Sequence, residues 1–312
     1  MSTILITGGT GMVGKALTKY LVSKGHHVII LSRNAANRKA TADVEYAEWN
    51  VEQQKIDIAA VQKADHIIHL AGASVFDKRW TASYKKEIEE SRTLSSRLLV
   101  DTLKNHPNSV KTVVSSSAIG WYGADKTAGH YFTEEEPADD GFLGKICVAW
   151  EQSIQPVTQS GARLVIMRTG IVLGNGDGFL APIQKGLRFG MATITGSGKQ
   201  VVSWIHIDDL CRMFLYAIEN ESIHGSFNAV APNPVTMKTL VLKEALLKKG
   251  NFFISLHVPD FALKLVLGER SIEALKSTTV SSDKIKAEGF TFLHPTIDAA
   301  LQSLAQEEKS KI

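Results

Sequence analysis

The chain has 312 residues and a mass of 34.0 kDa, more than one hydrophobic core usually organises. We therefore expect one large domain with a smaller appendage. Hydrophobic residues make up 44% and charged residues 21%, close to the globular average, which excludes a disordered or fibrous chain. The formal net charge is +3 with the two signs interspersed, so no basic block indicates nucleic-acid or membrane binding.

The strands expected from apolar runs are residues 3–7, 27–31, 44–49, 65–70, 110–115 and 163–168. The helices expected from 3.6-residue periodicity are 13–24, 82–104, 145–154 and 261–267, with a strand–turn–helix over 205–220. This alternation predicts an α/β fold, a Rossmann-type doubly wound parallel sheet with helices on both faces.

The alternation of strand and helix patterns stops after about residue 173. Glycine-rich stretches at 174–178 and 190–198 predict a substrate-side insertion of about 174–200. We expect the Rossmann domain to cover residues 1–232 and a smaller C-terminal α+β substrate domain to cover 233–312. Residues 307–311 are expected to form a solvated, frayed tail.

Cysteine usage and apolar-run length predict the compartment. Cys147 and Cys211 lie far apart, without the spacing of a disulfide framework or zinc knuckle, so we expect no metal site. Apolar runs such as 28–31 are too short to span a bilayer, and the apolar start ends at Ile6 before the glycines begin. A soluble, cytoplasmic protein without a membrane partner is predicted.

A glycine-rich loop lies directly between the first strand and the first helix, a context that predicts dinucleotide binding. Gly8 allows the tight turn, Gly11 lets a pyrophosphate approach the backbone, and Gly14 lets the helix pack close to the sheet. Backbone amides and the positive end of the helix dipole would hold the anion. The residues expected to bind the cofactor here are Gly8, Thr10, Gly11, Met12, Val13 and Gly14. An ordinary glycine turn is the alternative.

The end of the second strand indicates which dinucleotide is bound. It reads Leu31-Ser32-Arg33-Asn34, without the acidic residue that an NAD site uses for the ribose hydroxyls. Arg33 would pair with a 2′-phosphate and Ser32 would add a hydroxyl donor, which favours NADP over NAD. The alternative is that Arg33 is a solvated strand-end cation. At the end of the fourth strand, Leu70-Ala71-Gly72 would let the chain pass beside the adenine and ribose.

These motifs resemble an extended short-chain dehydrogenase/reductase, more narrowly the atypical epimerase-like subfamily of the NAD-dependent epimerase/dehydratase superfamily. The matching segments are Thr7-Gly8-Gly9-Thr10-Gly11 with Gly14, Leu31-Ser32-Arg33, Leu70-Ala71-Gly72-Ala73, Arg79-Trp80, Glu87 with Ser91-Arg92, Ser115-Ser116-Ser117-Ala118, Trp121-Tyr122-Gly123, Trp150-Glu151, Arg168-Thr169-Gly170-Ile171-Val172-Leu173-Gly174 and Trp204-Ile205-His206-Ile207-Asp208-Asp209-Leu210. From about residue 250 the chain resembles the subfamily's small C-terminal domain of uncharacterised role.

The resemblance implies positions for further cofactor residues. Ser32 and Arg33 would meet the adenosine phosphate, and Leu70, Ala71 and Gly72 would lie along the cofactor. Glu87, Arg92 and Val172 would lie near the cofactor or the pocket. From the sequence alone, Glu87 and Arg92 also fit solvated helix charges.

The acid/base pair of the superfamily is missing. In that superfamily a Tyr, its pKa lowered by a Lys four residues later on the same helix face, moves the proton, and a Ser shares it. Tyr20 precedes Lys24 at this spacing, but on the core-facing first helix, and Tyr122 precedes Lys126 in a loop. On the expected helix, the positions four and eight before Glu151 hold other residue types, Cys147 and Leu143.

Two hydroxyls are predicted to replace the pair. Ser117, or Ser116, follows the fifth strand where a substrate oxygen would lie, although backbone capping is a competing interpretation. Tyr122 could reach the same mouth and donate a proton, or it could be a packed aromatic. Trp204 and His206 are predicted to contact substrate, with His206 as acid/base or donor or as a structural histidine.

Asp208 is expected to cap the helix that follows. The sequence therefore predicts an NADP-binding oxidoreductase or epimerase-like enzyme, a monomer or homodimer. It would transfer hydride to or from a small polar, nucleotide-sugar-like molecule. The rival is a non-catalytic, NADP-bound scaffold or redox sensor that engages a protein partner. A nucleic-acid-binding module lacks support, because no basic stripe with interleaved aromatics is present.

Overall fold

The main sheet has eight strands in the order β12-β7-β6-β5-β1-β2-β3-β4. The computed structural model describes residues 1–176 and 178–310. The strands are β1 (Thr3–Thr7), β2 (His27–Ser32), β3 (Val44–Asn50), β4 (Lys55–Ile56), β5 (His66–His69), β6 (Thr112–Ala118), β7 (Arg163–Thr169) and β12 (Gly225–Ala229). Neighbours pair in parallel except β3 and β4. The predicted Rossmann-type α/β fold is confirmed, and all six predicted strands are present; β4 and β12 were missed.

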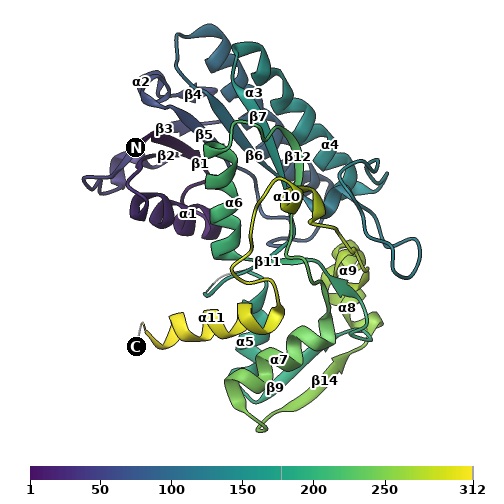
Figure 1. Cartoon of the computed structure of the whole chain (residues 1–312). Helices are drawn as coiled ribbons and strands as arrows, with labels where there is room; N and C mark the ends of the chain where they lie inside the picture. The colour runs from purple at the N-terminus through teal and green to yellow at the C-terminus, as the bar shows by residue number, and fades with distance from the viewer. Residues whose placement is uncertain (177, 311–312) are drawn as a thin grey trace.

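The central strands are continuous apolar runs because helices cover both faces of the sheet. Ile4 and Ile6 pack on one face and Leu5 on the other, all three fully buried. The face of Ile4 is covered by α1 (Met12–Ser23) and α6 (Ile207–Glu219). The opposite face is covered by α2 (Ile58–Lys63), α3 (Ala82–Asn105) and α4 (Phe142–Ile154), as Figure 1 shows.

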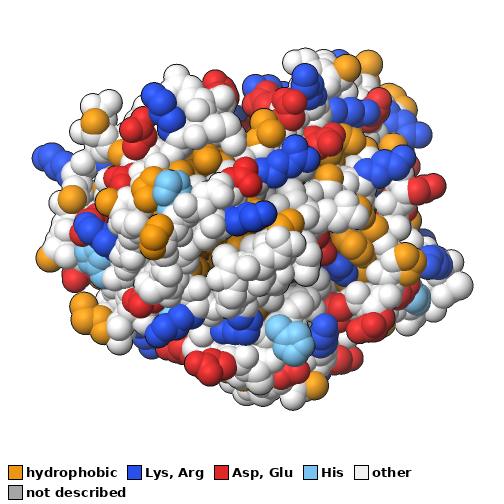
Figure 2. Space-filling model, turned by 90° about the horizontal axis from the view of Figure 1, so that it is seen from above, with side chains coloured by type: hydrophobic (Ala, Val, Ile, Leu, Met, Phe, Trp, Pro, Cys, Tyr) orange, Lys and Arg blue, Asp and Glu red, His pale blue; other side chains and the backbone are white. Residues whose placement is uncertain are grey.

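Among the described residues there are four short 3-10 segments, three in this half and the last in the second unit described below. They are η1 (Ala35–Asn37), η2 (Ile119–Trp121), η3 (Gln155–Ser160) and η4 (Gly268–Arg270). On the face drawn in Figure 2, Lys and Arg side chains lie interspersed with Asp and Glu, as the composition predicts.

A second unit lies below the main sheet in Figure 1 and is built from two distant parts of the chain. Its strands are β8 (Ile171–Leu173), β9 (Met191–Thr195), β10 (Val201–Val202), β11 (Trp204–His206), β13 (Val235–Thr236) and β14 (Ile254–Val258). Its helices are α5 (Leu180–Arg188), α7 (Met237–Lys249), α8 (Asp260–Leu267), α9 (Ser271–Leu275) and α11 (Ile297–Lys309). β9 pairs with β14, β8 with β11 and β10 with β13.

The pairing of β9 with β14 joins the predicted insertion to the predicted C-terminal domain. The chain then returns to the main sheet, where α10 (Asp283–Ala287) lies beside β12 and Lys284 Nζ donates to the Ser226 carbonyl over 2.9 Å. The boundary at residue 232 stays a prediction, but the chain crosses between the units more than once.

The last described helix is α11, which continues to Lys309, so residues 307–309 of the expected tail are helical. Lys311 of that tail and Asp177 of the first glycine-rich stretch lie outside the described residues. Among the residues that the structure describes, no helix has the length and apolar character needed to cross a membrane.

Candidate functional site

The glycine loop connects β1 to α1 at the carboxyl end of the sheet. Gly8 has a φ of +69°, and a Cβ there would lie 2.8 Å from the Leu70 carbonyl carbon. A Cβ on Gly14 would lie 2.4 Å from the Gly9 Cα, so only glycine lets α1 approach the loop this closely. A Cβ on Gly11 would meet only the Gly8 carbonyl oxygen, at 3.5 Å, and Gly11 faces solvent. The loop therefore fits a pyrophosphate that approaches the backbone at Gly11.

The N-terminus of α1 has no side-chain cap. Gly11 is the N-cap residue, and no acidic side chain lies in the first turn. Amides of a first helical turn have no partner within the helix and attract anions. This end of α1 therefore offers donors and positive dipole potential to a phosphate group.

The end of β2 presents the residues predicted to select the cofactor. Ser32 Oγ accepts from the Asn34 amide over 3.2 Å, which shapes the turn after the strand. Arg33 is exposed and forms no ion pair with any residue in 1–176 or 178–310. Its guanidinium is thus placed both for a 2′-phosphate and for simple solvation.

A buried polar chain, missed by sequence reasoning, fixes the wall next to the glycine loop. The amides of Leu70 and Ala71 each donate to Thr7 Oγ1 over 3.1 Å, and that hydroxyl lies 2.7 Å from His69 Nδ1. Thr7 therefore donates to His69, whose Nε2 lies 3.1 Å from Ser96 Oγ. Burial lowers the pKa of His69 to about 3, so the imidazole is neutral. These hydrogen bonds fix the backbone of the predicted cofactor residues Leu70 and Ala71.

The residues expected from α3 and β8 differ in their surroundings. A Cβ on Gly72 would lie 3.1 Å from Arg92 Cζ, and that guanidinium lies 4.8 Å from the centre of the Trp150 ring. Glu87 is half exposed and pairs with Lys78 over 3.1 Å, which favours the solvated interpretation of Glu87.

Val172 lies on β8 opposite Ile205 and is partly buried. It packs against the core cluster of the α1 face.

A buried ion pair occupies the place where the two catalytic hydroxyls were expected. Arg168 Nε lies 2.9 Å from Glu151 Oε1, and Nη2 lies 3.0 Å from Oε2. Ser117 Oγ donates to the same Oε1 over 2.7 Å. Arg168 also lies 3.6 Å from the centre of the Trp121 ring. The group ties β6, β7 and α4 together, and its hydrogen bonds span 17 and 34 residues of sequence.

Tyr122 is part of this buried group, whose surroundings oppose its predicted role as proton donor; that role stays a prediction. The side chain is 0% exposed, its hydroxyl donates to Asn228 Oδ1 over 2.8 Å, and it accepts from Arg168 Nη1 over 3.2 Å. Burial raises the pKa of Tyr122 to about 12, which opposes proton transfer near neutral pH. The packed-aromatic interpretation fits instead, because Tyr122 stacks on Phe132 at 5.1 Å.

Ser117 is 3% exposed and its proton is directed to Glu151, so the hydroxyl is committed to the ion pair. Its role in catalysis stays a prediction. Ser116 is partly buried on the other face of β6.

On α4, Leu143 and Cys147 lie against the loop after β6. A Cβ on Gly120 would lie 3.2 Å from Leu143 Cβ and 3.7 Å from Cys147 Sγ. Burial raises the pKa of Cys147 to about 11, so the thiol is protonated.

The side chains of Trp204 and His206, which were predicted to contact substrate, are both 0% exposed; this burial opposes the contact, which stays a prediction. Trp204 packs in the core and its Nε1 donates to the Asn233 carbonyl over 3.0 Å. His206 is the N-cap of α6: its Nδ1 accepts from the Asp208 amide over 3.1 Å. The cap is therefore His206, and Asp208, expected to cap, lies in the first turn.

A cavity of about 720 Å³ opens between α4 and the β7–β12 edge of the sheet. Its lining includes Trp121, Gln152, Leu164 and His224. These residues lie on the α4 face, and Leu164 is near the start of β7 rather than at the carboxyl end of the sheet. This cavity is separate from the glycine loop.

Comparison with known proteins settles the family. A model described as "NAD dependent epimerase/dehydratase family" matches residues 4–229. The chain belongs to the NAD-dependent epimerase/dehydratase family. A domain of unknown function, DUF1731, matches residues 258–304 of this epimerase family protein. The resemblance read from the motifs is confirmed.

Relatives match over nearly the full chain. Epimerase family protein YfhF of Bacillus subtilis is 36% identical over 313 residues, covering 98% of this chain and 99% of that protein. The crystal structure of a human epimerase family protein, SDR39U1 isoform 2, with NADPH has a TM-score of 0.85 at 28% identity, covering 97% of this chain and 99% of that one. A nucleoside-diphosphate sugar epimerase from Corynebacterium glutamicum has a TM-score of 0.74 at 29% identity, covering 99% of this chain and 61% of that one.

Proposed function

We propose that this epimerase family protein binds NADP at the glycine loop and acts as an oxidoreductase or epimerase on a small polar, nucleotide-sugar-like substrate. The observation that carries the cofactor choice is the end of β2, where exposed Arg33 stands with no acidic residue in Ser32-Arg33-Asn34. The NADPH in the related human structure and the name of the Corynebacterium relative support the proposal.

The cofactor, when bound, supplies a nicotinamide that can accept or donate hydride. The chain's own residues would bind and orient it. First-turn amides of α1 would hold the pyrophosphate beside Gly11, and the Arg33 guanidinium would hold the 2′-phosphate. Thr7 and His69 would keep the Leu70-Ala71 backbone in place beside the ribose.

The second candidate function is a non-catalytic, NADP-bound scaffold or redox sensor. It is favoured by the residues at the expected acid/base positions, Leu143 and Cys147, and by the burial of Tyr122 and Ser117. In this alternative the cofactor would order the protein without turnover, and the recognised partner would be another protein.

Binding of NADPH and NADH by calorimetry tests the cofactor choice. Charge-assisted hydrogen bonds contribute about 1.5–3 kcal/mol, so Arg33→Ala is expected to weaken NADPH binding roughly 10- to 100-fold. NADH binding should stay within about twofold, because NADH lacks the 2′-phosphate. Arg97→Ala, which removes an exposed cation on α3, is the matched control. Tighter binding of NADH than of NADPH by the unmodified protein would refute the proposal.

Turnover separates the two candidate functions. The protein is incubated with NADP⁺ and a panel of nucleoside-diphosphate sugars, which can be oxidised and epimerised, and separately with NADPH deuterated at C4 and the corresponding keto-sugars, which can accept hydride; products are analysed by mass spectrometry. Deuterium in a sugar, or an epimerised sugar, supports the enzyme. NADPH binding without any transfer across the panel supports the scaffold or sensor.

A further inference from the structure

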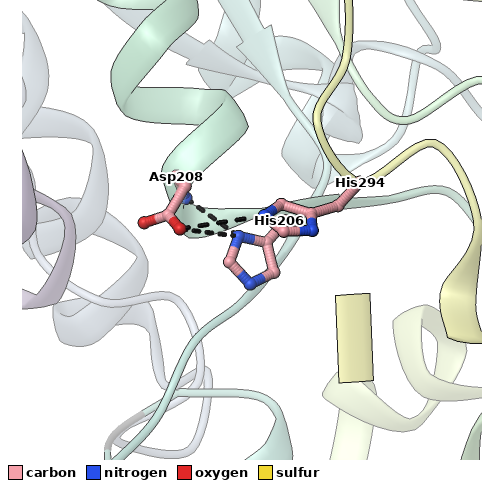
Figure 3. A group of neighbouring side chains, drawn as sticks. All are labelled: His206, Asp208 and His294. Atoms are coloured by element: carbon pink, nitrogen blue, oxygen red, sulfur yellow. Dashed lines mark hydrogen bonds and ion pairs between the residues drawn. The ribbon is translucent and has the colours of Figure 1, made fainter. Parts of the chain in front are cut away.

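Three side chains of types that commonly bind metal ions converge at the start of α6 (Figure 3). His206 ends β11, Asp208 lies in the first turn of α6, and His294 lies just before α11. Asp208 Oδ2 is 3.7 Å from His206 Nδ1 and 3.8 Å from His294 Nε2. One ligand atom from each residue lies within 4.8 Å of the other two.

These separations are too long for hydrogen bonds between the side chains. The two separations at Asp208 are close to the spacing of ligands that share one ion: bonds of about 2.0–2.2 Å in a tetrahedral zinc site put ligand atoms about 3.3–3.6 Å apart. Small side-chain rotations would close the few tenths of an ångström that remain at Asp208, and the ligand nitrogens of the two histidines, which lie within 4.8 Å of each other, would also move closer together. Two imidazole nitrogens and one carboxylate oxygen form a donor set that suits Zn²⁺.

The backbone around His294 is already fixed against α6. The fully buried carboxylate of Asp209 accepts from the amides of Leu293 and His294, each over 2.8 Å. Arg212 Nη1 donates to Asp209 Oδ1 over 2.7 Å and to the Thr291 carbonyl over 2.8 Å. His294 is therefore held beside Asp208 by contacts that do not involve its own ring.

His206 directs the Nδ1 side of its ring to the same point. Its Nδ1 accepts the Asp208 amide, so the proton lies on Nε2 and the Nδ1 lone pair faces Asp208. The two imidazoles lie with their centres 3.9 Å apart.

We propose that His206, Asp208 and His294 bind one divalent transition-metal ion, with Zn²⁺ as the best match and water completing the coordination. The ion would cross-link the segment before α11 to the N-terminus of α6. Solvent can reach the site, because the Asp208 side chain is 47% exposed and that of His294 15% exposed. The expectation of no metal site rested on cysteine spacing, and this criterion cannot detect a site that contains no cysteine.

Two features set the expected strength of the site. An ion at Nδ1 would replace the cap hydrogen bond from the Asp208 amide. His206 Nε2 has no hydrogen-bond partner among the described residues, whereas metal-bound histidines normally donate their second N–H to an acceptor. We therefore expect weaker binding than at closed structural zinc sites.

Zinc titration tests the site directly. Protein without a histidine tag is treated with EDTA, dialysed, and titrated with Zn²⁺ against a chromophoric chelator, without cofactor. One ion per chain is expected, and His294→Ala and Asp208→Asn should each weaken binding at least about tenfold. Zn²⁺ should raise the melting temperature of the unmodified protein but not of the variants. His224→Ala, which removes an exposed histidine elsewhere, should bind like the unmodified protein.

Variants at Asp208 and His294 are chosen because His206 caps α6 and its loss could unfold the helix end. Their melting temperatures without metal confirm that they fold. Equal Zn²⁺ affinity in the unmodified protein and His294→Ala, or loss of affinity in His224→Ala, would overturn the proposal. Because NADP is absent from the titration, failure here is distinct from failure of the proposed function.

Discussion

Replacing Glu151 by glutamine removes one charge from the buried ion pair with Arg168 and keeps the side-chain size. The Arg168 side chain is 4% exposed and that of Glu151 is 10% exposed, so solvent cannot compensate the remaining guanidinium. The glutamine amide group would also direct two N–H donors toward Arg168 or Ser117, where acceptors are needed. We expect Glu151→Gln to destabilise the fold.

The magnitude follows from the burial of the pair. Removing one partner of a buried ion pair costs about 3–5 kcal/mol, because an uncompensated charge remains. For a chain of 312 residues, the entropy of unfolding gives a drop in melting temperature of about 5–8 °C. Replacing both partners, as in Glu151→Gln with Arg168→Met, should cost less than the two single losses combined.

The assay is thermal and urea unfolding followed by circular dichroism, with NADPH binding measured in parallel. Ser117→Ala is the matched control, because it removes one hydrogen bond to Glu151 and leaves the ion pair intact. It should cost about 1–3 kcal/mol, less than Glu151→Gln. NADPH affinity should stay within about twofold in both variants at temperatures where they are folded.

A different outcome would refute this reasoning. If Glu151→Gln lowers the melting temperature by less than about 2 °C, the pair does not hold β6, β7 and α4 together. If it also abolishes a turnover that the unmodified protein shows, Glu151 acts in the chemistry.

Three further measurements test the site. Gly11→Ala should leave the fold intact and weaken NADPH binding about tenfold or more. Gly14→Ala should instead destabilise the protein by about 1–3 kcal/mol, because the added Cβ would lie 2.4 Å from the Gly9 backbone. Equal effects of the two variants on binding and stability would contradict this. Burial lowers the folded-state pKa of His69 to about 3, so the contribution of His69 to stability is complete above pH 6.5 and declines as pH falls toward 3. His69→Gln should flatten that part of the plot of stability against pH. An unchanged plot would count against this assignment to His69. Cys147 and Cys211 are both buried, so a thiol reagent should modify them rapidly only after denaturation; fast labelling of the folded protein would show that α4 or α6 opens.

Local patterns made the sheet and the glycine loop predictable. The loop signal lies within seven consecutive residues, 8–14, and each central strand is a continuous apolar run. Strand β12 was missed because Gly225–Ala229 contains one large apolar side chain, Phe227, in an otherwise small and polar run. It forms a strand because pairing with β7 at the sheet edge supplies its hydrogen bonds.

The fate of the candidate catalytic residues could not be read from the sequence because it depends on distant partners. The buried Tyr122 hydroxyl donates a hydrogen bond to Asn228, which lies 106 residues away in the sequence. Ser117 is engaged by Glu151, 34 residues away. His206 lies at a strand end, where a site residue is common, but the segment around His294 covers it. Sequence position at the carboxyl end of a strand therefore does not establish exposure.

The replacement of the expected lysine by Cys147 removes a cation from α4, yet a cation remains nearby on α3. Arg92 lies over Trp150 and beside Gly72, and its charge acts to lower the pKa of Cys147, although burial raises that pKa overall. A guanidinium stays protonated and cannot exchange a proton near neutral pH, but it can bind an anionic or carbonyl oxygen. The site thus keeps positive charge beside the Leu70–Gly72 wall while it loses the Tyr–Lys pair. This combination supports cofactor binding more strongly than proton transfer, and it makes the deuterium-transfer experiment the decisive measurement for this chain.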